Sequence, residues 1–416
     1  MQVKRTYNKK IGLTSSSFFA LLVVLFWTKD TVLSFVIVAL SRIPIIGSVS
    51  LFISPLLFIV LLLLALPYIL KNIHFGDCVF VCSIALVVLF SDVFFEKNSP
   101  YINEQLWRII GLSIPLYFVG ISFNPQVIKR SLYYASVASI VVMFLYQIYY
   151  LKSGRELNSD NMDAAYNVLP SAMYLFYRSF EKNKLKDWCL SVAGLVLLFV
   201  FGTRGAILAC LLFVVVNIIY KIYIEKNILK KSSIILACLI VMSIFFIGNN
   251  MLNIAKFLSV KFGKMGFSTR IFDFVIQGNL KYSSGRDILQ NKIWEAIKDN
   301  PFGYGCMGDR PIIDTYSHNI ILEIFCSYGV LIGSIILIGL LYLILLGLNR
   351  ARGTDLFLPL LLFVIMVLTK LMLSGSYIVE PYFYFLIGVC VQSIRIYSKR
   401  SCCRYEDCRN KYANEW

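Results

Sequence analysis

The sequence predicts an all-α polytopic membrane protein. Of its 416 residues, 58% are hydrophobic and only 15% are charged, whereas soluble globular domains carry about 25% charged residues. Apolar runs of about 17 to 25 residues, long enough for a helix to cross about 30 Å of hydrocarbon, follow one another along most of the chain. The net charge of +17 comes from short basic clusters between these runs. That pattern is typical of membrane topology and does not indicate a nucleic-acid partner.

The first element is a basic stretch, 1–10, followed by an apolar run from Ile11 to Trp27. It predicts a retained signal anchor with a cytoplasmic amino terminus. Further membrane-spanning helices are predicted at about 50–70, 77–95, 107–122, 131–151, 164–180, 188–203, 204–220, 232–249, 317–347, 355–374 and 378–397.

The segment Thr31–Ser50 is apolar, but Arg42 and Pro44 interrupt it. Counting it as a further span would place the basic carboxyl-terminal tail, 398–416, on the opposite side of the membrane from the basic amino terminus, which contradicts the positive-inside rule. We therefore expect an interfacial or re-entrant piece here. The prediction is then about twelve transmembrane helices with both termini in the cytoplasm.

This topology divides the chain into an amino-terminal bundle at 1–249, a large periplasmic loop at 250–316, carboxyl-terminal transmembrane helices at 317–397 and the cytoplasmic tail. Ionisable residues inside or at the ends of spans all fall toward the outer side: Asp92, Arg108, Arg204, Glu323, Lys370 and Glu380. Snorkelling explains any one of them taken singly. Their gathering on one rim favours a shared polar cavity that opens to the periplasm.

The end of the loop predicts an amphipathic helix on the outer surface. Ser284 and Asp287 have the spacing of a capping box. Apolar residues then recur at helical spacing up to Asn300 and Pro301, namely Leu289, Ile293, Trp294 and Ile297. The glycines of the following segment, Phe302–Gly305, predict a tight turn.

Two arginines are candidates for binding an anion. Arg286 falls in the first turn of the predicted helix, where backbone N–H groups also favour negative charge. A guanidinium can hold phosphate oxygens in bidentate fashion, although a solvated surface charge explains its spacing equally well. Arg204 lies in Phe201–Ala206, where two apolar spans meet in a very short turn. An arginine there is unfavourable unless an anion or a carboxylate accompanies it.

His318 opens the helix after the loop, with Asn319 beside it and Glu323 one turn later. A histidine can take a proton from a sugar hydroxyl or position a phosphate, and a hydrogen-bonded histidine at a helix start is the structural alternative. No metal-ligand spacing is found on the outer side, and no nucleotide-binding glycine pattern is found in the chain. The sequence therefore predicts no metal or cofactor, and a substrate that arrives already activated as a lipid pyrophosphate.

Three motifs resemble the O-antigen ligase and O-antigen polymerase superfamily. His318-Asn319, nine residues and then Gly329 match its H-N-x9-G pattern, although Ile332 stands where ligases have Gly, Thr or Tyr. Gly202–Ala206 is similar to its [ST]-R-[GSA]-A signature. Arg286, Trp294, Pro301 and the following Gly-Tyr-Gly resemble its R-x-x-x-W…P-x-x-G-x-G run with a wider Arg-to-Trp spacing. Gly308-Asp309-Arg310 and Glu323 look more like polymerases of the Wzy type than like ligases.

The resemblance implies an inverting, metal-independent glycosyltransferase with a bundle similar to the GT-C class, located in the bacterial inner membrane. It implies an undecaprenyl-pyrophosphate-linked glycan as donor and as acceptor, with a chain-length regulator and a flippase as partners. By motif, Arg204 and Arg286 hold the leaving pyrophosphate and His318 activates the attacking hydroxyl. The residues expected to seat sugars are Arg310, Asn319, Glu323 and Asn161.

Two other functions remain open at the level of the sequence. A ligase would transfer the same polymer to the lipid A core. A flippase for lipid-linked sugars would have the same membrane topology but would not require His318.

Overall fold

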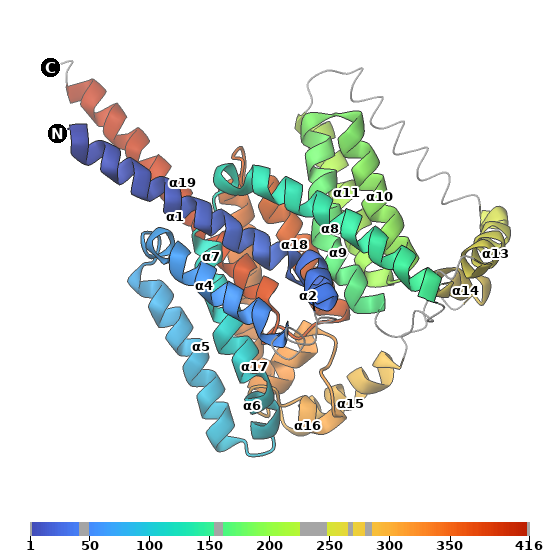
Figure 1. Ribbon diagram of the computed structural model, residues 1–416. Helices are drawn as coiled ribbons and strands as arrows, with labels where there is room; N and C mark the ends of the chain where they lie inside the picture. Colours follow the sequence, from blue (N-terminus) through green and yellow to red (C-terminus); the bar gives the residue numbers. More distant parts are fainter. Residues whose placement is uncertain are drawn as a thin grey trace. The chain divides into compact units, whose positions relative to one another are not determined.

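The computed structural model describes residues 2–40, 50–153, 161–224, 248–264, 269–278 and 285–413, and all regular secondary structure within these ranges is helical (Figure 1). The chain separates into two compact units. Unit 1 comprises Met1–Ala20, Leu62–Ile128 and Gly285–Trp416, and unit 2 comprises Leu21–Leu61 and Lys129–Ser284.

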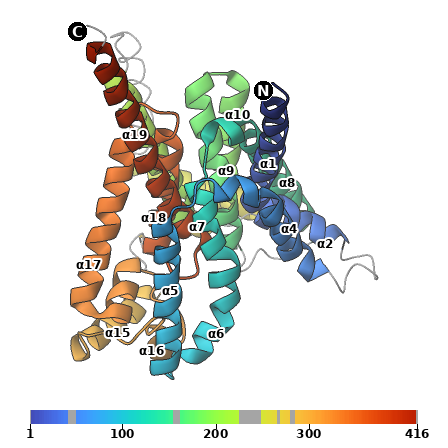
Figure 2. The same ribbon diagram turned by 90° about the vertical axis from the view of Figure 1, so that its left-hand side faces the viewer.

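Unit 1 contains the carboxyl-terminal helices and the helices between Leu62 and Ile128. In chain order its helices are the first part of α1 (Gln2–Thr28), the end of α4 (Ser50–Leu70), α5 (Phe75–Phe94), α6 (Ser99–Trp107), the π-helical turn η2 (Arg108–Ser113), α7 (Ile114–Ile121), α15 (Arg286–Asp299), α16 (Arg310–Ile313), α17 (Ile320–Ala351), α18 (Phe357–Leu373) and α19 (Pro381–Ala413). Helix α19 packs along both α17 and α7 (Figure 2).

Glycines bring α7 and α19 together in unit 1. A Cβ atom added to Gly120 would lie 2.4 Å from the carbonyl oxygen of Phe385, and one added to Gly388 would lie 2.3 Å from that of Tyr117. Small residues that let two helix backbones approach closely are typical of membrane helix pairs. Phe123 packs edge-on against Phe385 nearby. Gly120 and Gly388 therefore allow the close packing of this helix pair.

Unit 2 contains η1 (Lys29–Leu33), α2 (Ser34–Leu40), most of α8 (Pro125–Ser153), α9 (Asn161–Lys182), α10 (Leu185–Phe201), α11 (Arg204–Ile224), α13 (Gly248–Lys264) and α14 (Arg270–Ile276). Helix α9 packs against α10 and α11. The indole N–H of Trp27 lies 3.0 Å from the hydroxyl of Ser136 and 3.1 Å from that of Ser171, so a buried polar seam ties α1, α8 and α9 together.

Five helices of the described ranges are long and apolar enough to cross a membrane: Ser15–Val38, Phe52–Leu70, Phe75–Phe94, Pro125–Tyr149 and Ile320–Ala351. Shorter apolar helices are found at Arg204–Tyr220 and Phe357–Leu373. Helices also occupy the other predicted spans except 232–249, most of which lies outside the described residues. The count of twelve stays a prediction.

The first helix is longer than the sequence predicted. Instead of ending at Trp27, it continues through the π-helical turn Lys29–Leu33 and on to Leu40. The apolar residues after Thr31 are therefore part of the first span as far as Val38, and only the remainder of the predicted interfacial piece, 41–49, falls outside the described residues. Where the helix continues past Trp27, the side chains of Lys29 and Asp30 lie 2.7 Å apart as an ion pair.

Candidate active site

His318 and Asn319 together start helix α17. Asn319 is the N-cap residue, and its side-chain oxygen accepts hydrogen bonds from the backbone N–H groups of Ile321 and Leu322 at 2.9 and 3.5 Å. This satisfies two donors that a helix start leaves without partners. His318, immediately before the cap, has a φ of 54°, in the left-handed region that residues other than glycine seldom adopt.

The imidazole of His318 is half-buried and neutral at pH 7. Its ring centroid lies 4.1 Å from that of Tyr316. Burial, together with the positive charge of Arg286, lowers the pKa of His318 to about 4. The Nδ1 atom is buried and has no hydrogen-bond partner among the described residues. A neutral imidazole with an uncommitted nitrogen can accept a proton from a hydroxyl group.

Gly329, the last residue of the motif, interrupts α17. Its φ and ψ are 76° and 172°, which only glycine adopts without strain. The break lets the loop at Pro301–Gly305 pair with the α17 backbone: the Val330 N–H bonds to the carbonyl of Pro301 at 2.9 Å, and the Tyr304 N–H bonds to that of Cys326 at 2.8 Å. A Cβ atom on Gly303 would lie 2.4 Å from the Gly329 nitrogen. The Pro301–Gly305 loop and the break at Gly329 are therefore bonded to each other as one structural element.

Arg286 is the first residue of the predicted amphipathic helix, now α15. Its guanidinium donates a hydrogen bond to the carbonyl of Leu373 at the end of α18. The N-cap is Gly285, with a φ of 81°, whereas Ser284 of the predicted capping box lies outside the described residues. Ile293 and Ile297 form the buried face of α15 as expected, while Trp294 is 45% exposed and does not belong to it.

A turn between α18 and α19 connects these groups. The Tyr316 hydroxyl donates to the carbonyl of Ser374 at 2.8 Å, one residue after the carbonyl that Arg286 contacts. Across the same turn the Lys370 ammonium lies 2.6 Å from the Glu380 carboxylate. The structure therefore brings His318 and Arg286 to one region of unit 1, through a turn at 374–380 that no sequence motif indicated.

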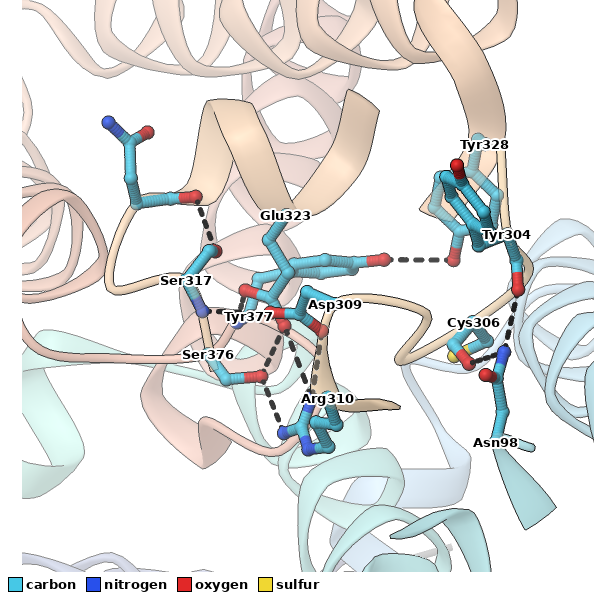
Figure 3. A network of polar contacts seen from close by, with 11 residues as sticks. Asn98, Tyr304, Cys306, Asp309, Arg310, Ser317, Glu323, Tyr328, Ser376 and Tyr377 are labelled. Carbon is cyan, nitrogen blue, oxygen red and sulfur yellow. Dashed lines mark hydrogen bonds and ion pairs between the residues drawn. The ribbon is translucent and has the colours of Figure 1, made fainter. Parts of the chain in front are cut away.

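Beside this region lies a fully buried network of charges (Figure 3). The carboxylates of Asp309 and Glu323 are 0% and 1% exposed, and the Arg310 guanidinium lies 3.4 Å from the first and 3.9 Å from the second. Arg310 also donates to the Ser376 hydroxyl at 3.2 Å, and Ser376 donates to Glu323. The Tyr377 N–H donates to the other Glu323 oxygen at 3.1 Å. Opposite charges and hydrogen bonds offset only part of the cost of burial, and burial still raises the pKa of Asp309 above its usual range.

The network bears on two predicted sugar-binding residues, Arg310 and Glu323. Arg310 is only 7% exposed, and both side chains are bonded within the chain. This burial indicates that they support the loop. Direct contact between them and a sugar stays a prediction.

The α5–α6 hairpin holds the other side of the loop. The Asn98 side-chain amide donates to the carbonyls of Tyr304 and Cys306 at 2.7 and 3.0 Å (Figure 3). The Cys306 N–H in turn donates to the Ser91 hydroxyl at 2.9 Å. These contacts join residues more than two hundred positions apart. The sequence carried no signal for them, because neither Asn98 nor Ser91 belongs to any motif.

The two remaining predicted residues belong to unit 2. Arg204 is the first residue of α11, and Gly202 ends α10 with a φ of 69°. The predicted tight turn between two apolar helices is therefore present. Asn161 is the first residue of α9. Over the described residues, no group of three or more His, Cys, Asp or Glu side chains is arranged to hold a metal ion.

Residues 189–338 match the family model described as O-antigen ligase, a range that includes Arg204, Arg286, His318 and Gly329. No curated protein and no solved structure matches the chain. Together with the apolar helices, the family match indicates a membrane protein with a ligase- or polymerase-type glycosyltransferase function. The predicted resemblance is thereby confirmed for residues 189–338, whose match is consistent with the O-antigen polymerase and ligase superfamily.

Proposed function

We propose that this protein is an O-antigen polymerase, which joins undecaprenyl-pyrophosphate-linked repeat units on the periplasmic face of the inner membrane. The observation that carries the proposal is a neutral His318 imidazole close enough to Arg286 for its pKa to respond to that charge, within the matched family region. A base for a hydroxyl group and a cation for a phosphate are the two groups that glycosyl transfer from a lipid pyrophosphate requires.

In the proposed reaction, a hydroxyl oxygen of the acceptor repeat unit attacks the anomeric carbon of the donor. His318 takes the hydroxyl proton, a new glycosidic bond forms, and the bond between the anomeric carbon and the pyrophosphate oxygen breaks with inversion. Arg286 and Arg204 stabilise the negative charge of the departing undecaprenyl pyrophosphate, since guanidinium groups hold phosphate oxygens in bidentate fashion. We expect Asn161 to contact sugar.

Because the arginines supply the positive charge, the proposed transfer needs no divalent cation. Purified protein given a synthetic lipid-linked repeat unit is expected to form polymer in the presence of EDTA. A complete loss of polymer in EDTA that added metal restores would contradict a metal-independent mechanism.

The ligase alternative is favoured by the description of the matched family model, and a gene deletion separates the two functions. Loss of a polymerase leaves single repeat units on the lipid A core, whereas loss of a ligase leaves long polymer on undecaprenyl. Electrophoresis of the surface glycan, with detection of the lipid-linked pool, distinguishes these outcomes. We expect the single repeat unit.

Complementation of the deletion strain tests the site. A His318→Ala variant is expected to leave the chain-length defect uncorrected, and the matched control His74→Ala is expected to restore long chains. His74 is the other of the two histidines in the chain, and its side chain is 52% exposed. Normal long chains with His318→Ala at normal expression would remove His318 from the mechanism and favour a flippase.

A further inference from the structure

The segment that leads into His318 has an unfavourable backbone conformation. Asp314 and His318 have φ angles of 55° and 54°, in the left-handed region. Residues with a Cβ atom are uncommon there unless the surrounding structure holds them. Neither is a glycine, so other contacts have to fix the path of the chain between α16 and α17.

Asp309 makes the most buried of these contacts. One carboxylate oxygen accepts the backbone N–H of Ser317 at 2.8 Å, and the other lies 3.4 Å from the Arg310 guanidinium. Figure 3 shows the Ser317 nitrogen directed at this carboxylate. Arg310 is itself fixed by the Ser376 hydroxyl at 3.2 Å. Since Ser317 directly precedes His318, this bond fixes the Tyr316–Ser317 peptide unit, one residue before the left-handed conformation of the histidine.

We propose that Asp309 is a positioning residue for His318: its carboxylate, held by Arg310, fixes the Ser317 peptide and thereby the orientation of the imidazole toward the reacting hydroxyl. Its catalytic consequence rests on the proposed function. The positioning itself does not rest on that function, because it concerns only the His318 ring and the loop that leads into it.

The chain offers a closely matched control in Asp77, which lies in the same unit at the start of α5. Asp77 is 1% exposed, accepts a backbone N–H from His74 at 2.7 Å and pairs with Arg395 at 2.7 Å. Asp309 is equally buried and has the same two kinds of partner. Each aspartate thus bonds to the backbone at or next to a different histidine, and the chain has only two histidines.

Nuclear magnetic resonance of the full-length protein in detergent, labelled with ¹³C only at histidine, reads both imidazoles at once. The two signals are assigned with His74→Gln. We expect Asp309→Ala to move the His318 signal and leave the His74 signal in place, and Asp77→Ala to do the reverse. Asp309→Asn, which retains an oxygen acceptor for the Ser317 N–H, is expected to return the His318 signal most of the way. An unchanged His318 signal in Asp309→Ala would overturn the proposal, as would equal movement in both aspartate variants.

Polymerisation assays on the same variants test the consequence. We expect Asp309→Ala to lower kcat about 10- to 100-fold with little change in KM, because misplacement of a catalytic group by about 1 Å has effects of this size. Asp77→Ala is expected to change kcat less than Asp309→Ala does. If the His318 signal moves but the native protein forms no polymer, positioning stands and the proposed function fails. A moved signal with unchanged kcat would contradict a catalytic consequence.

Discussion

At the scale of single residues, the protonation of His318 is controlled by burial first and by Arg286 second. Both favour the neutral ring, so its pKa falls from an ordinary value of about 6.5 to about 4. We expect an NMR titration of the labelled protein to give a midpoint near pH 4. In Arg286→Gln the midpoint is expected to rise, while staying below the ordinary value because burial remains.

The same shift has a consequence for stability. Between about pH 6.5 and 4 the unfolded chain binds a proton at His318 that the folded chain does not, so this residue destabilises the fold as the pH falls through that window. Compared with the native protein, a His318→Gln variant is expected to lose less thermal stability between pH 7 and pH 5. An identical loss in both proteins would contradict the lowered pKa.

Asn319 illustrates how a residue of a family motif can have a structural purpose. Its side chain caps α17 through Ile321 and Leu322. Asn319→Ala is expected to destabilise the protein by about 1 kcal/mol, and Asn319→Asp, which retains the cap, by much less. Thermal unfolding in detergent measures this. If Asn319→Asp is stable but inactive, the amide N–H₂ also contacts sugar, as the sequence predicted.

The residues of the site differ in how well the sequence revealed them. His318 and Arg286 were recognisable because they belong to motifs with fixed spacing, and the structure brings them to the same region. Asp309 was noticed only within Gly308-Asp309-Arg310, and its bond to the Ser317 backbone was not foreseen. Ser376 and Asn98 were not recognisable, because serine and asparagine are common and their partners lie far away in the chain. Ser376 is 66 positions from Arg310 and Asn98 is 206 positions from Tyr304. Hydropathy and local spacing carry no information on such pairs.

At the scale of elements, the break in α17 is the feature that local pattern predicted least. Periodicity and hydropathy predicted one continuous helix, since Gly329 is flanked by apolar residues on both sides. In the structure this glycine gives up helical geometry so that the Pro301–Gly305 loop can bond to the backbone. The H-N-x9-G spacing thus measures the distance along the chain from the cap of α17 to its break.

This interpretation of Gly329 makes a prediction with a control in the same helix. A Cβ atom at Gly329 would lie 2.4 Å from the Pro301 carbonyl oxygen, whereas one at Gly339 would meet nothing within 4 Å. Gly329→Ala is expected to destabilise the protein by at least about 1–3 kcal/mol from backbone strain alone and to abolish polymerisation. Gly339→Ala is expected to be neutral or slightly stabilising. Equal thermal stability of the two variants in detergent would contradict a required break.

At the scale of the whole molecule, the length of α17 relates the candidate site to the membrane. The 20 residues from Val330 to Asn349 that follow the break would span about 30 Å as an α-helix, the thickness of the hydrocarbon core. The turns before the break, with His318 at their start, then lie outside the hydrocarbon on one side. Arg350 and Arg352 follow the same stretch on the other side. The positive-inside rule therefore predicts that these arginines lie in the cytoplasm and the candidate site in the periplasm.

Reporter fusions test this orientation directly. Alkaline phosphatase, which folds only outside the cytoplasm, is expected to be active when fused after Asn300 and inactive when fused after Arg352. β-Galactosidase fused at the same two positions is expected to give the reverse pattern, which controls for expression. Phosphatase activity at both positions would mean that α17 does not cross the membrane after its break. The opposite pattern would place His318 and Arg286 in the cytoplasm, where nucleotide sugars are available, and a lipid-linked donor would then no longer be the substrate that the site requires.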